Sequence, residues 1–328
     1  MNEPIWNKFL TERDKQVFAS AGYGMRQGFG KRPALLIVDV NYDFCGDKPE
    51  PILESIKRWR NSCGEEAWEG VKAIRRLLAA GRAKDLPVIY TTSERRPDNW
   101  DAGSWAWKNS RTRERVSVSG SGLRGSQIVP DIAPEPRDIV IHKLKPSAFH
   151  GTPLASHLTL LGADSLILAG TTTSGCVRAT VLDAFSNNYR VTLVEEGCFD
   201  RSQASHAINL CDMHAKYADV VKLKEVIAFI DTLPQGMFDL PKPEQAAAHG
   251  SGTGVKRAIT LKPSKTTSAK AVDRDNPHWS EEMLGPPIMR RGREPQKAPT
   301  KVLTSLRRVR ERGLTAGSTA TIRKRAVR

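Results

Sequence analysis

The chain has 328 residues, enough for one large α/β domain or two ordinary ones. Its net charge is +15, but residues 241–328 hold 20 Lys and Arg against 7 Asp and Glu and so account for +13 of it. The first 240 residues carry only +2, which excludes a strongly basic nucleic-acid-binding body and assigns the basic character to the tail.

Three further features bear on the protein's location. Residues 1–15 mix charged and isolated apolar residues without the apolar run of a signal peptide. The longest apolar runs, such as residues 34–38, have the length of strands and are too short to span a bilayer. The five cysteines, an odd number without a CxxC pair, favour reduced thiols over a disulfide framework or a zinc ribbon. We therefore expect a soluble, cytoplasmic protein that does not contact membranes.

Residues 33–240 alternate short β-rich runs with helical patterns, which is typical of a doubly wound α/β fold with a mostly parallel sheet. The predicted strands, in chain order, are 34–40, 88–92, 138–143, 165–170, 190–195 and 219–223. The predicted helices are 65–84, 152–161, 175–186, 202–217 and 224–233. We expect a single domain with a six-stranded sheet and helices on both faces.

The remaining segments do not show this alternation of strands and helices. Residues 1–32 are predicted to form an N-terminal arm. Residues 93–137 are long and irregular and contain three tryptophans, which indicates a functional segment or a subunit contact. Residues 241–328 lack sustained apolar periodicity and are predicted to be a basic, disordered tail.

Three polar residues occur where predicted strands end. Asp39 closes the first strand, Lys143 closes the third, and Cys176 follows the fourth at the start of a helix. Because ligands of doubly wound sheets bind outside the carboxyl ends of the strands, these side chains are expected to meet at one edge. Each has an ordinary structural alternative: a buried cysteine, a turn-capping aspartate, or a solvated lysine. Their joint placement favours catalysis.

The chemistry of the three residues fits a nucleophilic site. A helix N-terminus and a nearby lysine stabilise a thiolate, so Cys176 is expected to have a thiolate of this kind. The backbone N–H groups of the same turn suit an oxyanion. Asp39 can accept the thiol proton and deliver it to a leaving nitrogen.

Several segments around these residues resemble the isochorismatase-like cysteine hydrolases, in particular the branch with N-carbamoylsarcosine amidase and maleamate amidohydrolase. The matching segments are RPALLIVDVNYDF (32–44), IHKLKPSAFHGTPL (141–154), GTTTSGCVRATVLDAF (170–185), GCFDR (197–201) and DMHAKYADV (212–220). The similarity covers about residues 7–240 and does not reach the tail.

The resemblance implies roles for particular residues. Asp39, Lys143 and Cys176 match the catalytic triad of the family. The peptide between Thr171 and Thr172 matches a cis bond of the family, with the N–H groups of Thr172 and Cys176 forming the oxyanion hole. The implied substrate-binding residues are Arg201, which matches a carboxylate-binding position, and, more weakly, Arg178, Tyr42 and Phe149, with Trp105 and Trp107 as further candidate walls.

The implied function is hydrolysis of a small linear amide or carbamoyl compound bearing a carboxylate. No cofactor is expected, and no metal site, because no histidine precedes His142. The family also implies a homo-oligomer, a dimer or a tetramer. Two alternatives stay open: hydrolysis of a nicotinamide-type amide or biuret-like urea by the same triad, and nucleic-acid binding through the tail, which the tail's lack of aromatic interleaving disfavours.

Overall fold

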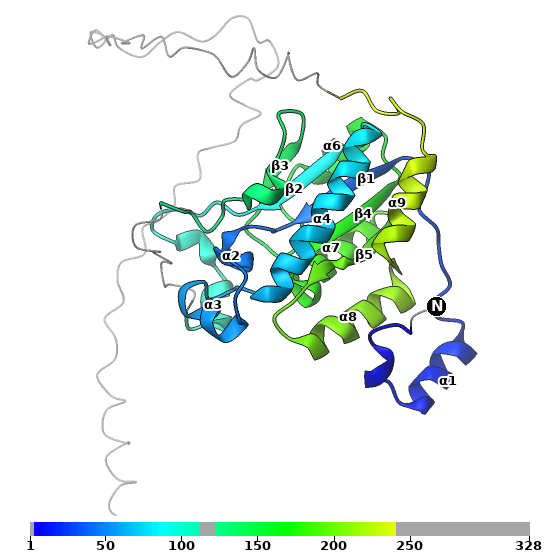
Figure 1. The fold of residues 1–328 in the computed structure, drawn as a ribbon, viewed down its shortest axis with the longest axis horizontal. Helices are drawn as coiled ribbons and strands as arrows, with labels where there is room; N and C mark the ends of the chain where they lie inside the picture. The colour runs from blue at the N-terminus through cyan, green and yellow to red at the C-terminus, as the bar shows by residue number, and fades with distance from the viewer. Residues whose placement is uncertain (1–2, 112–121, 241–328) are drawn as a thin grey trace, which may run out of the picture. The chain divides into compact units, whose positions relative to one another are not determined.

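The computed structural model describes residues 3–111 and 122–240, and the predicted basic tail lies outside this part of the chain. Its centre is a six-stranded sheet in the order β3-β2-β1-β4-β5-β6, in which each paired strand runs parallel to its neighbour (Figure 1). The strands are β1 (Pro33–Val38), β2 (Val88–Thr92), β3 (Ile139–His142), β4 (Ser165–Thr171), β5 (Arg190–Phe199) and β6 (Asp219–Val221). The predicted doubly wound α/β fold is confirmed.

Helices cover both faces of the sheet. The larger ones are α1 (Glu12–Ala21), α4 (Glu65–Ala83), α6 (Leu154–Leu161), α7 (Arg178–Ser186), α8 (Gln203–Lys216) and α9 (Leu223–Thr232). The shorter ones are η1 (Asn7–Phe9), α2 (Tyr42–Cys45), α3 (Ile52–Arg58), η2 (Trp100–Ala102), α5 (Trp105–Lys108), η3 (Pro130–Ile132) and the π-helical turn η4 (Thr173–Val177). Within the described residues, no helix is long and apolar enough to cross a membrane.

The apolar sequence of β1 explains the two layers. Its residues are fully buried and alternate between the faces, as the two-residue period of a strand requires. Leu35 and Ile37 belong to the core under α4 and α9, which lie in front of the sheet in Figure 1. Leu36 and Val38 belong to the second core, which includes α6, α7 and α8. A strand buried on both faces is therefore a nearly continuous apolar run.

The structure differs from the predicted elements in several places. The N-terminal arm contains the unpredicted helix α1, which begins with a capping box between Thr11 and Asp14. The helix predicted from residue 175 is divided, because the π-turn η4 precedes α7. Strand β5 continues to Phe199, four residues beyond its predicted end, and so reaches the edge where the polar residues gather.

Gly170 marks the close approach of β4 to β1. Its φ is 124°, and an added Cβ would collide with the backbone of Val38. Because backbone atoms cannot rotate away as a side chain can, we expect Gly170→Ala to lower the free energy of unfolding by about 2–3 kcal/mol. Urea denaturation followed by circular dichroism measures this. Gly28→Ala is the control, since Gly28 has a similarly positive φ of 77° but open space around it; an equal loss in both variants would contradict a steric cause.

Candidate active site

The three polar residues predicted to meet do lie at one edge of the sheet. Asp39 directly follows β1, Lys143 directly follows β3, and Cys176 lies in the π-turn after β4. The strand order reverses between β1 and β4, so this edge is the topological switch point of the sheet. All three residues are buried, with 4%, 6% and 7% of their surfaces exposed.

Asp39 and Lys143 form a buried ion pair, in which the Lys143 Nζ lies 2.7 Å from the Asp39 Oδ2. The other carboxylate oxygen, Oδ1, accepts a hydrogen bond of 2.7 Å from the Thr91 hydroxyl. Burial lowers the pKa of Lys143, but its interactions with the Asp39 carboxylate and, secondarily, with Cys176 outweigh this effect, so the pKa lies above its ordinary value. The ammonium is therefore held in its charged form beside the carboxylate.

Cys176 completes the group, since its thiol lies within hydrogen-bonding reach of both Asp39 and Lys143. Burial, assisted by the Asp39 charge and opposed by Lys143, raises the pKa of this thiol to about 12. The raised pKa favours the thiol over the thiolate expected at a helix N-terminus, and Cys176 lies in a π-turn that runs into α7 at Arg178. The resting group is a thiol beside a carboxylate that can accept its proton.

The turn that carries the thiol is closed by its own backbone. The carbonyl of Thr172 accepts the N–H groups of Gly175 and Val177, at 2.9 and 3.2 Å. The hydroxyl of Thr180 donates to the Cys176 carbonyl at 2.7 Å. The peptide bond between Thr171 and Thr172 is cis.

A cleft of about 1310 Å³ opens onto the buried group. Asp39, Lys143, Thr172, Cys176 and Arg201 line it. The segment after β2 also lines it, including all three of its tryptophans, Trp100, Trp105 and Trp107. Its lining cations outnumber its lining acids, and besides Lys143 they are Arg60, Arg95, Arg96, Lys145 and Arg201. This charge favours an anionic ligand.

Arg201 lies in the cleft wall just after β5. One of its guanidinium nitrogens, Nη1, donates to the Asn61 carbonyl at 2.8 Å. The structure places three other predicted substrate-binding residues away from the cleft lining. Tyr42 stacks on Trp59, with ring centroids 5.9 Å apart, and the Phe149 ring packs near Tyr189.

Arg178 is the third of these residues. Its Nη1 donates to the Asn209 side chain at 2.6 Å and pairs with Asp212 at 3.3 Å. Both partners belong to α8, so the guanidinium is engaged between α7 and α8. Arg178, Tyr42 and Phe149 are therefore not part of the proposed site.

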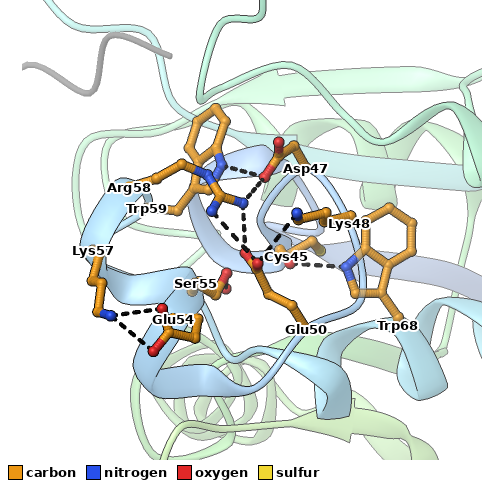
Figure 2. Close-up of polar contacts among 11 residues, drawn as sticks. Cys45, Asp47, Lys48, Glu50, Glu54, Ser55, Lys57, Arg58, Trp59 and Trp68 are labelled. Carbon is orange, nitrogen blue, oxygen red and sulfur yellow. Dashed lines mark hydrogen bonds and ion pairs between the residues drawn. The ribbon is translucent and has the colours of Figure 1, made fainter.

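A cluster of polar contacts supports the segment that carries Arg60 and Asn61 (Figure 2). Arg58 bridges Asp47 and Glu50, at 2.7 and 2.5 Å, and the Trp59 indole donates to Asp47 at 2.9 Å. The Trp68 indole of α4 donates to the Cys45 carbonyl at 3.0 Å, which ties the segment to the body of the domain. The cluster therefore fixes one wall of the cleft.

The sequence did not identify the residues that hold Asp39 and the turn of Cys176 in position. Thr91 donates a hydrogen bond to Asp39, and the buried Asp200 accepts hydrogen bonds from Ser174 in the turn that carries Cys176. Asp43 is a further acid in the cleft wall, and burial raises the pKa of its carboxyl. Its position four residues after Asp39 is the only sequence signal for it. Among the described residues, no group of three or more His, Cys, Asp or Glu side chains is placed to hold a metal ion.

Comparison with known proteins decides the family, since the isochorismatase domain model matches residues 33–225. The chain belongs to the isochorismatase family. It is 31% identical over 243 residues to an N-carbamoylsarcosine amidase of Arthrobacter sp, covering 70% of this chain and 83% of that protein. It is also 31% identical over 206 residues to a maleamate amidohydrolase of Pseudomonas putida, covering 62% and 90%. A solved isochorismatase family structure from Desulfovibrio vulgaris has a TM-score of 0.51 at 28% identity, covering 62% of this chain and all of that one. The predicted family is confirmed.

Proposed function

We propose that this family member hydrolyses the C–N bond of a small linear amide or carbamoyl compound that carries a carboxylate, with Cys176 as nucleophile. The observation that carries the proposal is the buried thiol beside the Asp39–Lys143 ion pair at the floor of a cationic cleft. Two relatives, an N-carbamoylsarcosine amidase and a maleamate amidohydrolase, support amide hydrolysis and a carboxylated substrate.

In the first half of the reaction, Asp39 accepts the thiol proton while the Cys176 sulfur attacks the carbonyl carbon. The backbone N–H groups of Thr172 and Cys176 stabilise the oxyanion that forms. Asp39 then gives the proton to the leaving nitrogen, the C–N bond breaks, and ammonia departs from the acyl-enzyme.

In the second half, Asp39 accepts a proton from water as the water oxygen attacks the thioester. The C–S bond breaks, the proton returns to the sulfur, and the acid product leaves. Lys143, 2.7 Å from Asp39, balances the negative charge of the carboxylate before it accepts a proton and again after it gives the proton up. These steps consume one water and release ammonia and a carboxylic acid.

The test is ammonia release from maleamate, N-carbamoylsarcosine, nicotinamide and allophanate-like ureas. Release from a carboxylated linear amide supports the proposal. Release from nicotinamide or a urea alone favours the alternative substrates, for which the tryptophans of the cleft wall would supply flat apolar surface. The homo-oligomer and the cytoplasmic location stay predictions.

Arg201→Ala tests the carboxylate. A charge-assisted hydrogen bond contributes about 1.5–3 kcal/mol, so KM for a carboxylated amide is expected to rise roughly 10- to 100-fold. The KM of a substrate without a carboxylate should stay the same. Arg178→Ala is the matched control, because its guanidinium contacts α8 and does not line the cleft. Equal KM effects of both variants on the carboxylated amide would contradict the assignment.

A further inference from the structure

Asp200 joins two parts of the site that are far apart in sequence. It follows β5 and is only 4% exposed. Its Oδ2 accepts the backbone N–H and the hydroxyl of Ser174, at 2.8 and 2.7 Å. Its Oδ1 accepts the backbone N–H of Arg201 at 2.8 Å. One carboxylate therefore binds the turn of the nucleophile with one oxygen and the start of the arginine loop with the other.

The contacts leave the Arg201 guanidinium directed elsewhere. Although the two residues are adjacent in sequence, the Arg201 guanidinium donates to the Asn61 carbonyl and not to the Asp200 carboxylate. The charge of Asp200 is instead met by backbone N–H groups and a hydroxyl, which are strong donors to a carboxylate. Asp200 thus orders the arginine's backbone without neutralising the charge that the proposed substrate would bind.

A second anchor holds the same turn without contacting the arginine loop. The Thr173 hydroxyl lies 2.8 Å from the His206 Nδ1 and 3.2 Å from the Phe199 carbonyl. The hydrogen bonds of this anchor do not involve the Asp200 or Arg201 side chains, so its loss should disturb the position of Cys176 more than that of Arg201. Loss of Asp200 would disturb both Cys176 and Arg201, so the two anchors can be separated by experiment.

We infer that Asp200 is a positioning residue that fixes the distance between the nucleophile and the carboxylate-binding arginine, and thereby sets the preference for carboxylated amides. The inference rests on the proposed function. It concerns a residue that does not itself touch the reacting atoms, and it predicts an effect on substrate preference that a merely structural carboxylate would not have.

Asp200→Asn is the discriminating variant. An asparagine has one acceptor and one donor group, so either orientation of its amide places N–H against N–H, on the Ser174 side or on the Arg201 side. Succinamate and butanamide are the probes, because they differ by the carboxylate alone. We expect kcat/KM for succinamate to fall about 100-fold, with lower kcat and higher KM, and the succinamate-to-butanamide ratio of kcat/KM to fall at least 10-fold.

Two control variants show whether the change in the substrate ratio is specific to Asp200. Thr173→Val should lower kcat and leave the substrate ratio unchanged. Asp164 resembles Asp200 in accepting backbone N–H groups, from Lys31 and Arg32, and a serine hydroxyl. It precedes β4 and so lies at the opposite edge of the sheet. Asp164→Asn should therefore change neither kcat nor the substrate ratio. An unchanged substrate ratio in Asp200→Asn, or an effect equal to that of Asp164→Asn, would overturn the inference.

Alkylation of Cys176 by iodoacetamide, followed by peptide mass spectrometry, separates this inference from the proposed function. If the wild-type enzyme releases ammonia from neither probe, the proposed function fails for these amides. Slower alkylation in Asp200→Asn than in wild type and Asp164→Asn would still support the positioning of the thiol, and an unchanged rate would overturn it. If Asp200→Asn does not fold, Ser174→Ala removes one of the same bonds, and it should slow both kcat and alkylation about fivefold; no change in either would count against Asp200.

Discussion

Replacement of Cys176 by alanine is expected to lower kcat/KM for the true substrate by on the order of 10⁴-fold, because it removes the sulfur that forms the acyl-enzyme in the proposed mechanism. The fold should persist. The side chain that is lost is small, and removing one buried sulfur costs on the order of 1 kcal/mol through the cavity it leaves. Initial rates of ammonia release over a range of substrate concentrations and thermal unfolding of the same preparation measure the two effects.

Cys211→Ala is the matched control for this variant. Cys211 is also buried, at 5% exposed, but it lies on α8 and does not line the cleft. Its loss should cost similar stability and leave turnover unchanged. Turnover retained by Cys176→Ala would exclude the thiol as nucleophile, and an equal loss in both variants would show that activity merely follows stability.

The sheet and the three polar residues at its edge were predictable because both follow from short-range patterns. Apolar runs of strand length, separated by helical patterns, specify a parallel sheet, and the carboxyl ends of its strands must then share one edge. Asp39 and Lys143 could therefore be expected near each other although 104 positions separate them in the chain. Whether the group is catalytic is the proposal that the variants test.

The residues that line the cleft were harder to predict, because the direction of each side chain depends on the conformation of an individual turn. A helix starting at residue 175 would put Arg178 in its first turn beside Cys176, but the π-turn η4 changes the rotation, and Arg178 pairs with α8 instead. Tyr42 lies in the unpredicted helix α2, which buries it against Trp59. Asp200 binds Ser174 from 26 positions away, and no local pattern encodes such a contact.

Asp39→Asn is expected to reduce kcat/KM on the order of 10³-fold or more, since the thiol, with its pKa of about 12, then lacks the group that accepts its proton. The double variant Asp39→Asn/Cys176→Ala should be no less active than Cys176→Ala alone, because residues that act as one unit have non-additive effects. A product of the two single effects in the double variant would mean that they act independently.

The single variant Asp39→Asn should also have a lower free energy of unfolding than the wild type, by an amount that depends on pH. In the wild type, pairing with Asp39 raises the pKa of Lys143 above 10.5, so the pair stabilises the fold fully below that pH, and the stabilisation is lost as the pH rises through the raised pKa. Asp39→Asn leaves a buried cation alone, which costs about 3–5 kcal/mol.

In the variant, burial is no longer outweighed and lowers the pKa of Lys143. The pH dependence of stability then reverses its sign. The variant is least stable at low pH and regains stability as the pH rises and the lysine is deprotonated. Urea unfolding of both proteins from pH 6 to 10 measures this. Asp43→Asn exchanges another, partly buried carboxyl of the same cleft for an amide and should show a smaller loss without this recovery. A stability difference between wild type and Asp39→Asn that does not narrow with rising pH would contradict the buried ion pair as its cause.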